Sequence, residues 1–331
     1  MANKRVLSIF FEGLKIFVIN IHKFLLYMAF PVLGQVAGLF LVFGATFWFT
    51  QNYQDLVIKY PALNDMSTML ICSIALVIPG LLILVKALWD YLVAFGAINS
   101  MVEGYKNTGR VYDFRAHNEV VWKKTFSFIA IWFLISIFTI VAIIPVFWIF
   151  AFIFFVYFVL VFQVFTFENG LSPIGYFKRS FELIKGNFAR TFLLMAILGL
   201  FTYCLLPSGL SVIFDYFNWT NSLAKTFENW AYSLPLEMVE QFGITPQLVG
   251  KTIVQELVLF VMIGFTLPLR SICWTLWYNN FAEPQVVEKP KKRKRTTSTK
   301  KVQQLPKTFK IEKRGIDPEI IRRARLEDDE Y

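Results

Sequence analysis

Long apolar runs alternate with short polar segments along most of the chain. Six of these runs reach the roughly 20 residues that a helix needs to cross the hydrocarbon core of a bilayer. The pattern therefore predicts an all-α protein, a polytopic membrane bundle of about six transmembrane helices arranged as three hairpins within residues 1–282. The expected spans are about 24–49, 68–99, 125–143, 146–167, 191–214 and 253–273.

The run 125–167 contains no charged residue and is too long for a single span. As one helix it would measure about 65 Å, twice the thickness of the bilayer core. Pro145 lies near its middle, cannot donate a backbone hydrogen bond and disfavours helix just before it. We therefore expect two spans joined by a tight turn at Ile144 and Pro145. A re-entrant hairpin that does not reach the far surface is the alternative.

A charged stretch with helical periodicity, SPIGYFKRSFELIKGNFARTF at 172–192, precedes the fifth expected span. Ser172 suits an N-cap, Pro173 the first helical position and Gly186 the helix end. This amphipathic interface helix either contacts lipid head groups or forms a structural collar that guides the next span, and we favour the collar. Its expected apolar face comprises Ile174, Phe177, Phe181, Ile184 and Phe188. The candidate head-group contacts are Lys178, Arg179, Lys185 and Arg190.

The same spacing recurs before the first expected span and, more weakly, at 114–122 before the third. We interpret the chain as three units, each an interface helix followed by a two-span hairpin, with chance similarity between apolar segments as the alternative. The first copy comprises Leu7, Phe10, Leu14, Phe17 and Ile21. Three further positions match between copies, because Asn20, Lys23 and Leu25 correspond to Asn187, Arg190 and Phe192.

The basic residues orient the chain in the membrane. Net charge is +10, and the segments 1–23, 102–124 and 168–190 hold 13 Lys and Arg, against 3 in the segments expected on the opposite side. Positive residues accumulate on the cytoplasmic side of membrane proteins. The asymmetry predicts an inner (plasma) membrane protein with both termini in the cytoplasm.

The tail 283–331 differs in composition from the rest of the chain. It contains KPKKRKRTTSTKK at 289–301, which predicts a cytoplasmic, largely disordered basic segment. Such clusters bind either nucleic acid or anionic membrane surfaces. With six expected spans upstream, we favour contact with anionic lipid or with a cytoplasmic protein partner, and expect no binding to nucleic acid.

Ionisable residues within the spans are candidates for function, because charge is costly in hydrocarbon. They are Lys86, Asp90, Glu256 and Arg270. Lys86 and Asp90 lie four residues apart and are expected to pair on one helix face. The pair either snorkels at the inner surface as a structural element or lines a transport path.

Motifs of known enzymes are missing from the sequence. We find no His-Glu-x-x-His, phosphate-binding glycine loop or nucleophile elbow, and the three cysteines fall in apolar runs. We therefore expect no catalytic residues, no metal and no cofactor. The expected function is that of a non-enzymatic integral membrane protein in membrane organisation, lipid contact or scaffolding. The alternative is a small transporter or permease component that uses Lys86 and Asp90.

The stretch 172–188 also resembles a segment in a broad family of bacterial multi-pass proteins. That family is related to the membrane domain found with some glycerophosphoryl diester phosphodiesterases. The resemblance implies a six-span bacterial membrane protein over residues 1–280. It implies no phosphodiesterase activity, because no segment here forms a separate soluble catalytic domain. The matching positions are Ser172, Pro173, Lys178, Arg179, Ser180, Leu183, Lys185, Gly186, Asn187 and Phe188.

Overall fold

The computed structural model describes residues 5–111, 116–232, 243 and 245–282, and this part of the chain is almost wholly helical. Five of its helices are long and apolar enough to cross a membrane, or six if one sharply bent pair counts as a single span. The predicted all-α, multi-pass helical architecture is thus confirmed. The expected disordered tail, 283–331, lies outside the described residues.

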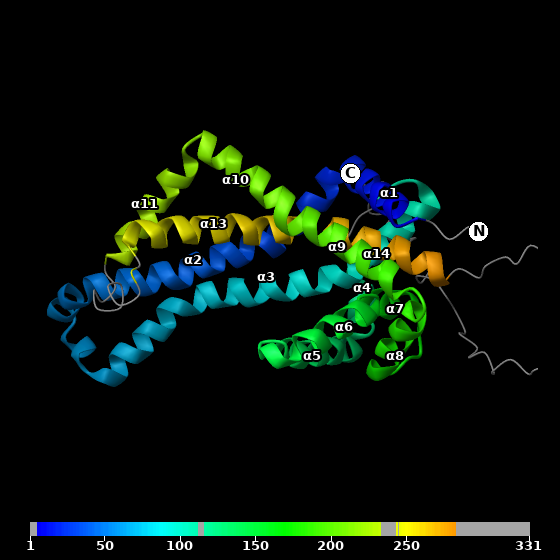
Figure 1. Cartoon of the computed structure of the whole chain (residues 1–331). Coiled ribbons are helices and arrows are strands. Elements are labelled where there is room, and N and C mark those ends of the chain that lie inside the picture. The colour runs from blue at the N-terminus through cyan, green and yellow to red at the C-terminus, as the bar shows by residue number, and fades with distance from the viewer. Residues whose placement is uncertain (1–4, 112–115, 233–242, 244, 283–331) are drawn as a thin grey trace, which may run out of the picture. The chain divides into compact units, whose positions relative to one another are not determined.

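The helices follow one another with short breaks (Figure 1). The first half of the chain forms α1 (Val6–Ile19), α2 (Ile21–Lys59), α3 (Met66–Thr108), α4 (Glu119–Trp122) and α5 (Thr125–Val141), with short 3₁₀ turns η1 (Pro61–Asn64) and η2 (Ala116–Asn118). The second half forms η3 (Pro145–Phe147), α6 (Trp148–Phe158), α7 (Val161–Phe167), α8 (Pro173–Ile184), α9 (Phe188–Gly199), the π-helical segment η4 (Leu200–Leu205), α10 (Leu206–Tyr216), α11 (Trp219–Ala231), α13 (Pro246–Phe265) and α14 (Leu267–Ala282).

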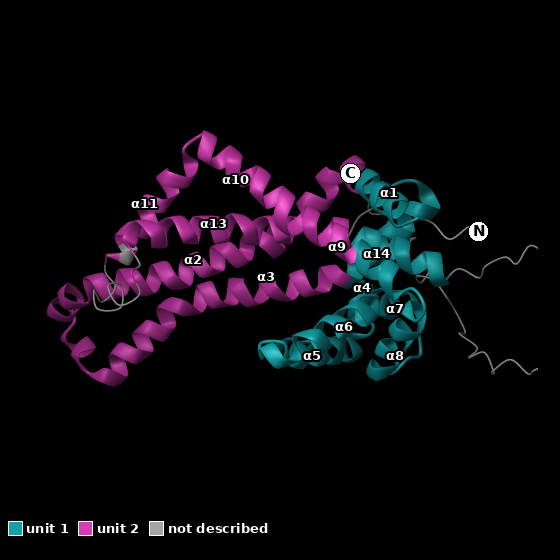
Figure 2. Cartoon of the chain, viewed as in Figure 1, with its two compact units in different colours: residues 1–16, 96–194, 271–331 teal, residues 17–95, 195–270 magenta. Residues whose placement is uncertain are grey.

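The chain divides into two compact units, coloured separately in Figure 2. Unit 1 comprises residues 1–16, 96–194 and 271–331, and unit 2 comprises 17–95 and 195–270. The boundaries fall inside helices α1, α3, α9 and α14. Each unit therefore collects segments that are far apart in the sequence.

In unit 2, glycines allow α2 to approach its neighbours closely. A Cβ on Gly38 would lie 2.7 Å from the backbone nitrogen of Leu84 on α3 and 2.9 Å from the carbonyl oxygen of Gly80. On the other side of α2, a Cβ on Gly264 of α13 would lie 2.6 Å from a methyl group of Val32. Small residues at such crossings are the usual basis of helix association in membranes, since apolar side chains gain little by leaving lipid.

In unit 1, the run 125–167 folds back on itself at the predicted place. Ile144 is extended and Pro145 begins the turn η3, as the sequence analysis expects. The two arms contact through Phe138 and Phe154, whose ring centroids are 3.6 Å apart. At 1.5 Å per residue, α5 is about 25 Å long, slightly less than the hydrocarbon core.

Helix α8 begins and ends as predicted, but its buried face is rotated. The Ser172 hydroxyl accepts a hydrogen bond from the N–H of Gly175 (3.1 Å), and Gly186 follows the helix with φ +87°. The expected apolar face is wrong in part, because Ile174 is 73% exposed and Phe181 37% exposed. The buried residues are Tyr176, Phe177, Ser180, Leu183 and Ile184, which pack against α5, α6 and α7.

The burial pattern of α8 recurs at α1 and, in its second half, at η2–α4. The shift along the chain that takes Val6 to Pro173, the first residues of α1 and α8, also takes Ile21 to Phe188, the first residues of α2 and α9. Two buried positions are shared by α1 and α8 alone: Ile9 with Tyr176, and Phe10 with Phe177. Three more are shared by α1, η2–α4 and α8, in that order: Gly13, His117 and Ser180; Ile16, Val120 and Leu183; Phe17, Val121 and Ile184. The three-unit interpretation of the sequence thus has a structural counterpart.

The central position of each copy contacts a helix from another part of unit 1. A Cβ on Gly13 would meet the Sγ of Cys273 on α14. The His117 Nδ1 lies 2.7 Å from the Oγ of Ser100 on α3. The Ser180 hydroxyl donates to the carbonyl oxygen of Tyr157 on α6 (2.9 Å). Each copy therefore packs on the returning helix of the preceding hairpin, and the first copy packs on the last helix.

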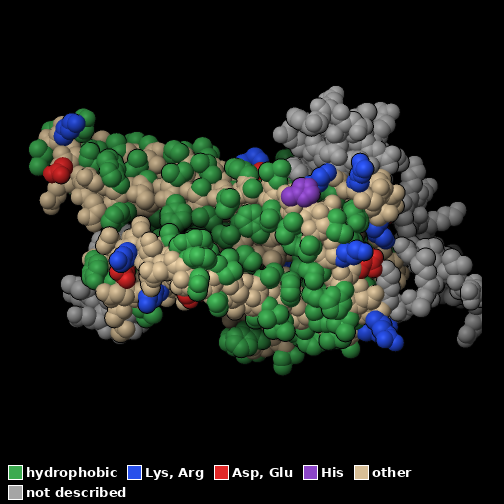
Figure 3. Space-filling model, turned by 90° about the horizontal axis from the view of Figure 1, so that it is seen from above, with side chains coloured by type: hydrophobic (Ala, Val, Ile, Leu, Met, Phe, Trp, Pro, Cys, Tyr) green, Lys and Arg blue, Asp and Glu red, His purple; other side chains and the backbone are tan. Residues whose placement is uncertain are grey.

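Large apolar side chains cover much of the surface, and few charges interrupt them on the face shown in Figure 3. Among them, Phe126 is 91%, Tyr216 83% and Ile58 80% exposed. A water-soluble chain rarely exposes apolar patches of this extent. Lipid is the solvent that suits such a surface, in agreement with the long apolar helices.

Replacing Gly38 by Val is expected to destabilise the protein, because the new side chain collides with the backbone of α3. Overpacking of this kind costs about 1–3 kcal/mol. Gly44→Val on the same helix is the matched control, since a Cβ there meets nothing within 4 Å. Thermal unfolding of both variants in one detergent measures the difference. Equal midpoints would contradict the close packing of α2 on α3.

Candidate functional site

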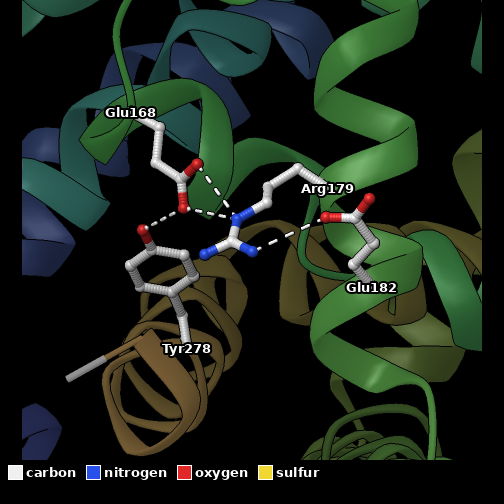
Figure 4. Close-up of polar contacts among 4 residues, drawn as sticks. All are labelled: Glu168, Arg179, Glu182 and Tyr278. Carbon is white, nitrogen blue, oxygen red and sulfur yellow. Dashed lines mark hydrogen bonds and ion pairs between the residues drawn. The ribbon is translucent and has the colours of Figure 1, made fainter. Parts of the chain in front are cut away.

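A buried carboxylate, Glu168, gathers polar groups from several parts of unit 1 (Figure 4). Its side chain is 1% exposed, and its two oxygens share a bifurcated hydrogen bond from the single Nε–H of Arg179 on α8, at 3.1 and 3.2 Å. It also accepts one from the hydroxyl of Tyr278 on α14, at 2.9 Å. Glu182 approaches the same guanidinium from the outside at 3.6 Å and is 49% exposed. The cluster ties the end of α7 to α8 and α14.

Lys124, at the junction of α4 and α5, approaches the same region from a different side. Its ammonium donates to the carbonyl oxygens of Phe165 (2.7 Å) and Glu168 (3.2 Å), at the C-terminal end of α7. Burial lowers the pKa of Lys124 to about 8. Burial, and secondarily the charge of Glu168, raises the pKa of the nearby Tyr176.

A second buried cluster consists of uncharged polar side chains and centres on Asn99 of α3. The Asn99 Oδ1 accepts hydrogen bonds from Gln163 (3.2 Å) and Thr275 (3.1 Å), and its Nδ2 donates to Thr166 (3.3 Å). These residues come from α3, α7 and α14, and each is at most 3% exposed. Buried polar groups are costly when they lack hydrogen-bond partners. These mutual hydrogen bonds therefore favour the close packing of α3, α7 and α14.

The contact between Ser100 and His117 combines a hydroxyl with an imidazole, as in serine nucleophiles and their bases. Both side chains are buried, at 0% and 2% exposure. A substrate therefore has no access to the Ser100 hydroxyl in this arrangement. Its position in the repeat, equivalent to Gly13 and Ser180, makes it a packing contact between helices.

Among the predicted intramembrane residues, Lys86 and Asp90 form the expected ion pair on α3. The Lys86 side chain is 62% exposed and its ammonium lies 5.8 Å from the ring centroid of Phe30. The uncharged stretch 66–85 that precedes it measures about 30 Å, which matches the hydrocarbon core. If this stretch fills the core, Lys86 lies at its boundary.

Arg270, at the start of α14, has its partners on η4, α13 and α3. Its NH1 donates to the hydroxyl of Tyr203 and its NH2 to the carbonyl oxygen of Ile263 (2.7 Å), while its buried Nε has no hydrogen bond in the described part of the chain. The guanidinium also interacts with Tyr91, the residue after Asp90. Tyr203 belongs to the π-helical segment η4, and π-helical turns are frequent at functional sites.

The other predicted residues are placed differently. Glu256 is exposed on α13 and makes no ion pair with a described residue. Arg179 is neutralised by Glu168 and Glu182, so it does not remain available for a head group. The remaining candidates on α8 and α9 are exposed and have no ion pair within the described ranges, namely Lys178, Lys185 and Arg190.

Glu168, Lys124 and the Asn99 cluster were missed by the sequence analysis. Glu168 directly follows an uncharged apolar run, which is the usual place for a solvated carboxylate. The signal that was present is Arg179, eleven residues later on a helix with an otherwise exposed polar face. Its partner Tyr278 is separated by more than one hundred residues and gives no local signal.

Searches of protein family models, of curated proteins and of solved structures find no match to this chain. The resemblance of 172–188 to the family related to the phosphodiesterase membrane domain therefore stays a prediction.

Replacing Glu168 by Gln is expected to destabilise unit 1, because Arg179 then loses the buried carboxylate that compensates its charge. Breaking a buried ion pair from one side costs about 3–5 kcal/mol. Glu182→Gln is the matched control, since this exposed partner of the same arginine is worth at most about 1 kcal/mol. Unfolding of both variants in detergent distinguishes them. Similar losses would contradict the central role of Glu168.

Proposed function

We propose that this chain is a non-enzymatic multi-pass membrane protein that contacts anionic lipid head groups through the α8–α9 segment. The observation that carries the proposal is that this segment buries one face and leaves three of its cations exposed. One face of α8 is buried against α5, α6 and α7, while Lys178 on α8, Lys185 directly after it and Arg190 in the first turn of α9 are exposed. These three cations thus lie on a helix packed against its neighbours and at the start of the apolar stretch Phe188–Tyr216.

The distribution of charge supports the same proposal. On the side that we propose to be cytoplasmic, basic residues far outnumber those opposite. Anionic lipid attracts each Lys or Arg near the surface by about 1 kcal/mol. Three cations therefore supply about 3 kcal/mol, roughly a hundredfold preference for an anionic surface. In this proposal α8 serves as a structural collar and as a lipid contact at once.

Neutralising the three cations together (Lys178→Gln, Lys185→Gln, Arg190→Gln) is expected to lower the anionic lipid that copurifies with the protein. Native mass spectrometry of the full chain in mild detergent, with and without the tail from Glu283, measures the bound lipid. The control is Lys59→Gln, Lys225→Gln, Lys251→Gln, which removes the three lysines of the opposite side. Equal loss in both triple variants, or none in either, would refute the proposal.

A small transporter is the second candidate, and the polar groups of unit 2 favour it. Arg270 interacts with Tyr203 of the π-helical segment and with Tyr91, which directly follows Asp90 in the sequence. Helix irregularities that meet ionisable groups mark many transporter sites. The orphan Nε of Arg270 adds a hydrogen-bond donor without a partner in the described part of the chain.

The double variant Lys86→Gln, Asp90→Asn distinguishes the two candidates. Under the lipid-contact proposal it inserts normally and loses at most about 1 kcal/mol of stability, because the pair is largely exposed. Under the transport candidate, wild-type proteoliposomes conduct protons or K⁺ and the variant does not. Flux measurements with a pH-sensitive dye and a K⁺ electrode decide. Absence of flux in the wild type for both ions counts against that form of transport.

A further inference from the structure

A pocket of about 520 Å³ in unit 1 carries a more specific inference. It opens between the α4–α5 junction and the turn that joins α7 to α8. Its lining includes two consecutive lysines, Lys123 and Lys124, together with Gly170 and Tyr176 on the facing side. The head-group candidates of α8 and α9 are not among the residues that line it.

Lys124 brings a positive charge to the pocket, and its described partners are two carbonyl oxygens and the ring of Phe165. Both of its hydrogen bonds go to carbonyl oxygens, and no carboxylate among the described residues pairs with it. Glu168, whose carbonyl oxygen accepts one of these hydrogen bonds, has its carboxylate held by Arg179 and Tyr278. Burial already disfavours the charged form of Lys124. An anion in the pocket would therefore gain more from this ammonium than from a fully hydrated one.

Lys123 adds a second positive charge at the rim. Its side chain is 48% exposed and lies 3.8 Å from Glu119, a long contact between two partly solvated groups. The partly solvated Lys123 side chain lines the pocket beside that of Lys124. The first turn of α5 begins here as well, and its backbone dipoles favour negative charge in the same direction.

The rim also has an apolar side, which identifies the kind of anion. Trp122 is 57% exposed and Phe126 91% exposed, and both line the pocket. Trp is enriched at the level of lipid head groups, and a free phosphate gains nothing from a phenyl ring beside it. A molecule with a phosphate and acyl chains satisfies both sides of the rim.

We propose that this pocket binds the phosphate of one anionic lipid, with Lys123 and Lys124 on the phosphate and Trp122 and Phe126 along the acyl chains. The inference rests on the proposed lipid contact but assigns a separate, built site. The α8–α9 cations attract the anionic surface in general, whereas the pocket retains an individual lipid.

Amine labelling of the wild-type chain in nanodiscs tests the pocket without a mutation. In zwitterionic lipid, the Lys124 amine is expected to titrate near its pKa of about 8. A bound phosphate favours the charged form, so in nanodiscs that contain phosphatidylglycerol its labelling at pH 8 falls by about fivefold for a pKa rise of about one unit. The exposed Lys15 of α1, which belongs neither to the pocket nor to the α8–α9 cations, corrects for the general surface potential in the same sample. The described titratable and charged groups around the pocket are Glu119, Lys123, Glu168, Tyr176, Arg179 and Tyr278.

Equal protection of Lys124 and of Lys15 would contradict a lipid site in the pocket. Protection of Lys124 by inorganic phosphate in zwitterionic nanodiscs, to the same degree as by anionic lipid, would assign the pocket to a soluble anion and overturn the lipid. Lys123→Gln is expected to reduce the protection while leaving the hydrogen bonds of Lys124 in place. Unchanged protection in this variant also counts against the proposal.

Native mass spectrometry separates failure of the pocket from failure of the proposed function. Lys124→Met together with Lys123→Gln is expected to lose the most tightly held anionic lipid, with helical content checked by circular dichroism. If the wild type retains anionic lipid and the double variant retains as much, the pocket is wrong and the general lipid contact stands. If the wild type retains no anionic lipid, the proposed function fails as well.

Discussion

Unit 1 depends on a single buried carboxylate. Glu168 binds Arg179 of α8 and Tyr278 of α14 through its side chain, and Lys124 through its carbonyl oxygen. A charge at 1% exposure is costly unless it is paired and hydrogen-bonded, so the loss of one partner weakens the arrangement of the others. The same requirement fixes which surface of α8 faces inward. The cations that remain exposed on α8 are therefore a consequence of where Glu168 lies.

Around this carboxylate, three short helical segments repeat one packing scheme with different chemistry. At the central position, Gly13 lies against the sulfur atom of Cys273, and His117 contacts the hydroxyl of Ser100. Ser180 donates a hydrogen bond to the carbonyl oxygen of Tyr157. The shared feature is a close approach between helices, and the side chain is whatever fills the remaining gap. In lipid, this close approach contributes more than apolar burial does, because acyl chains solvate leucine as well as another helix would.

The sequence was informative wherever the signal was local. The turn at Pro145, the Ser172 cap and the Lys86–Asp90 pair depend on neighbours within a few residues, and the structure contains all three. The predicted buried face of α8 was wrong because the prediction counted only apolar residues. Ser180 lies at the centre of the true buried face, where its hydroxyl donates a hydrogen bond to the carbonyl oxygen of Tyr157. Glu168 with Tyr278, and Arg270 with Tyr203, join segments far apart in the sequence, and no periodicity reports such pairs.

The contact between Gly13 and Cys273 closes the cycle of packing by joining the first helix to the last. The two later copies contact helices that are already synthesised when they emerge, but α1 has no such partner until α14 has been synthesised. At about 5–20 residues per second, the delay is on the order of 10–50 s. During this interval the apolar face of α1 needs another shelter, such as the bilayer surface or the insertion machinery. The order of biosynthesis thus allows α1 to make this contact only after α14 has emerged.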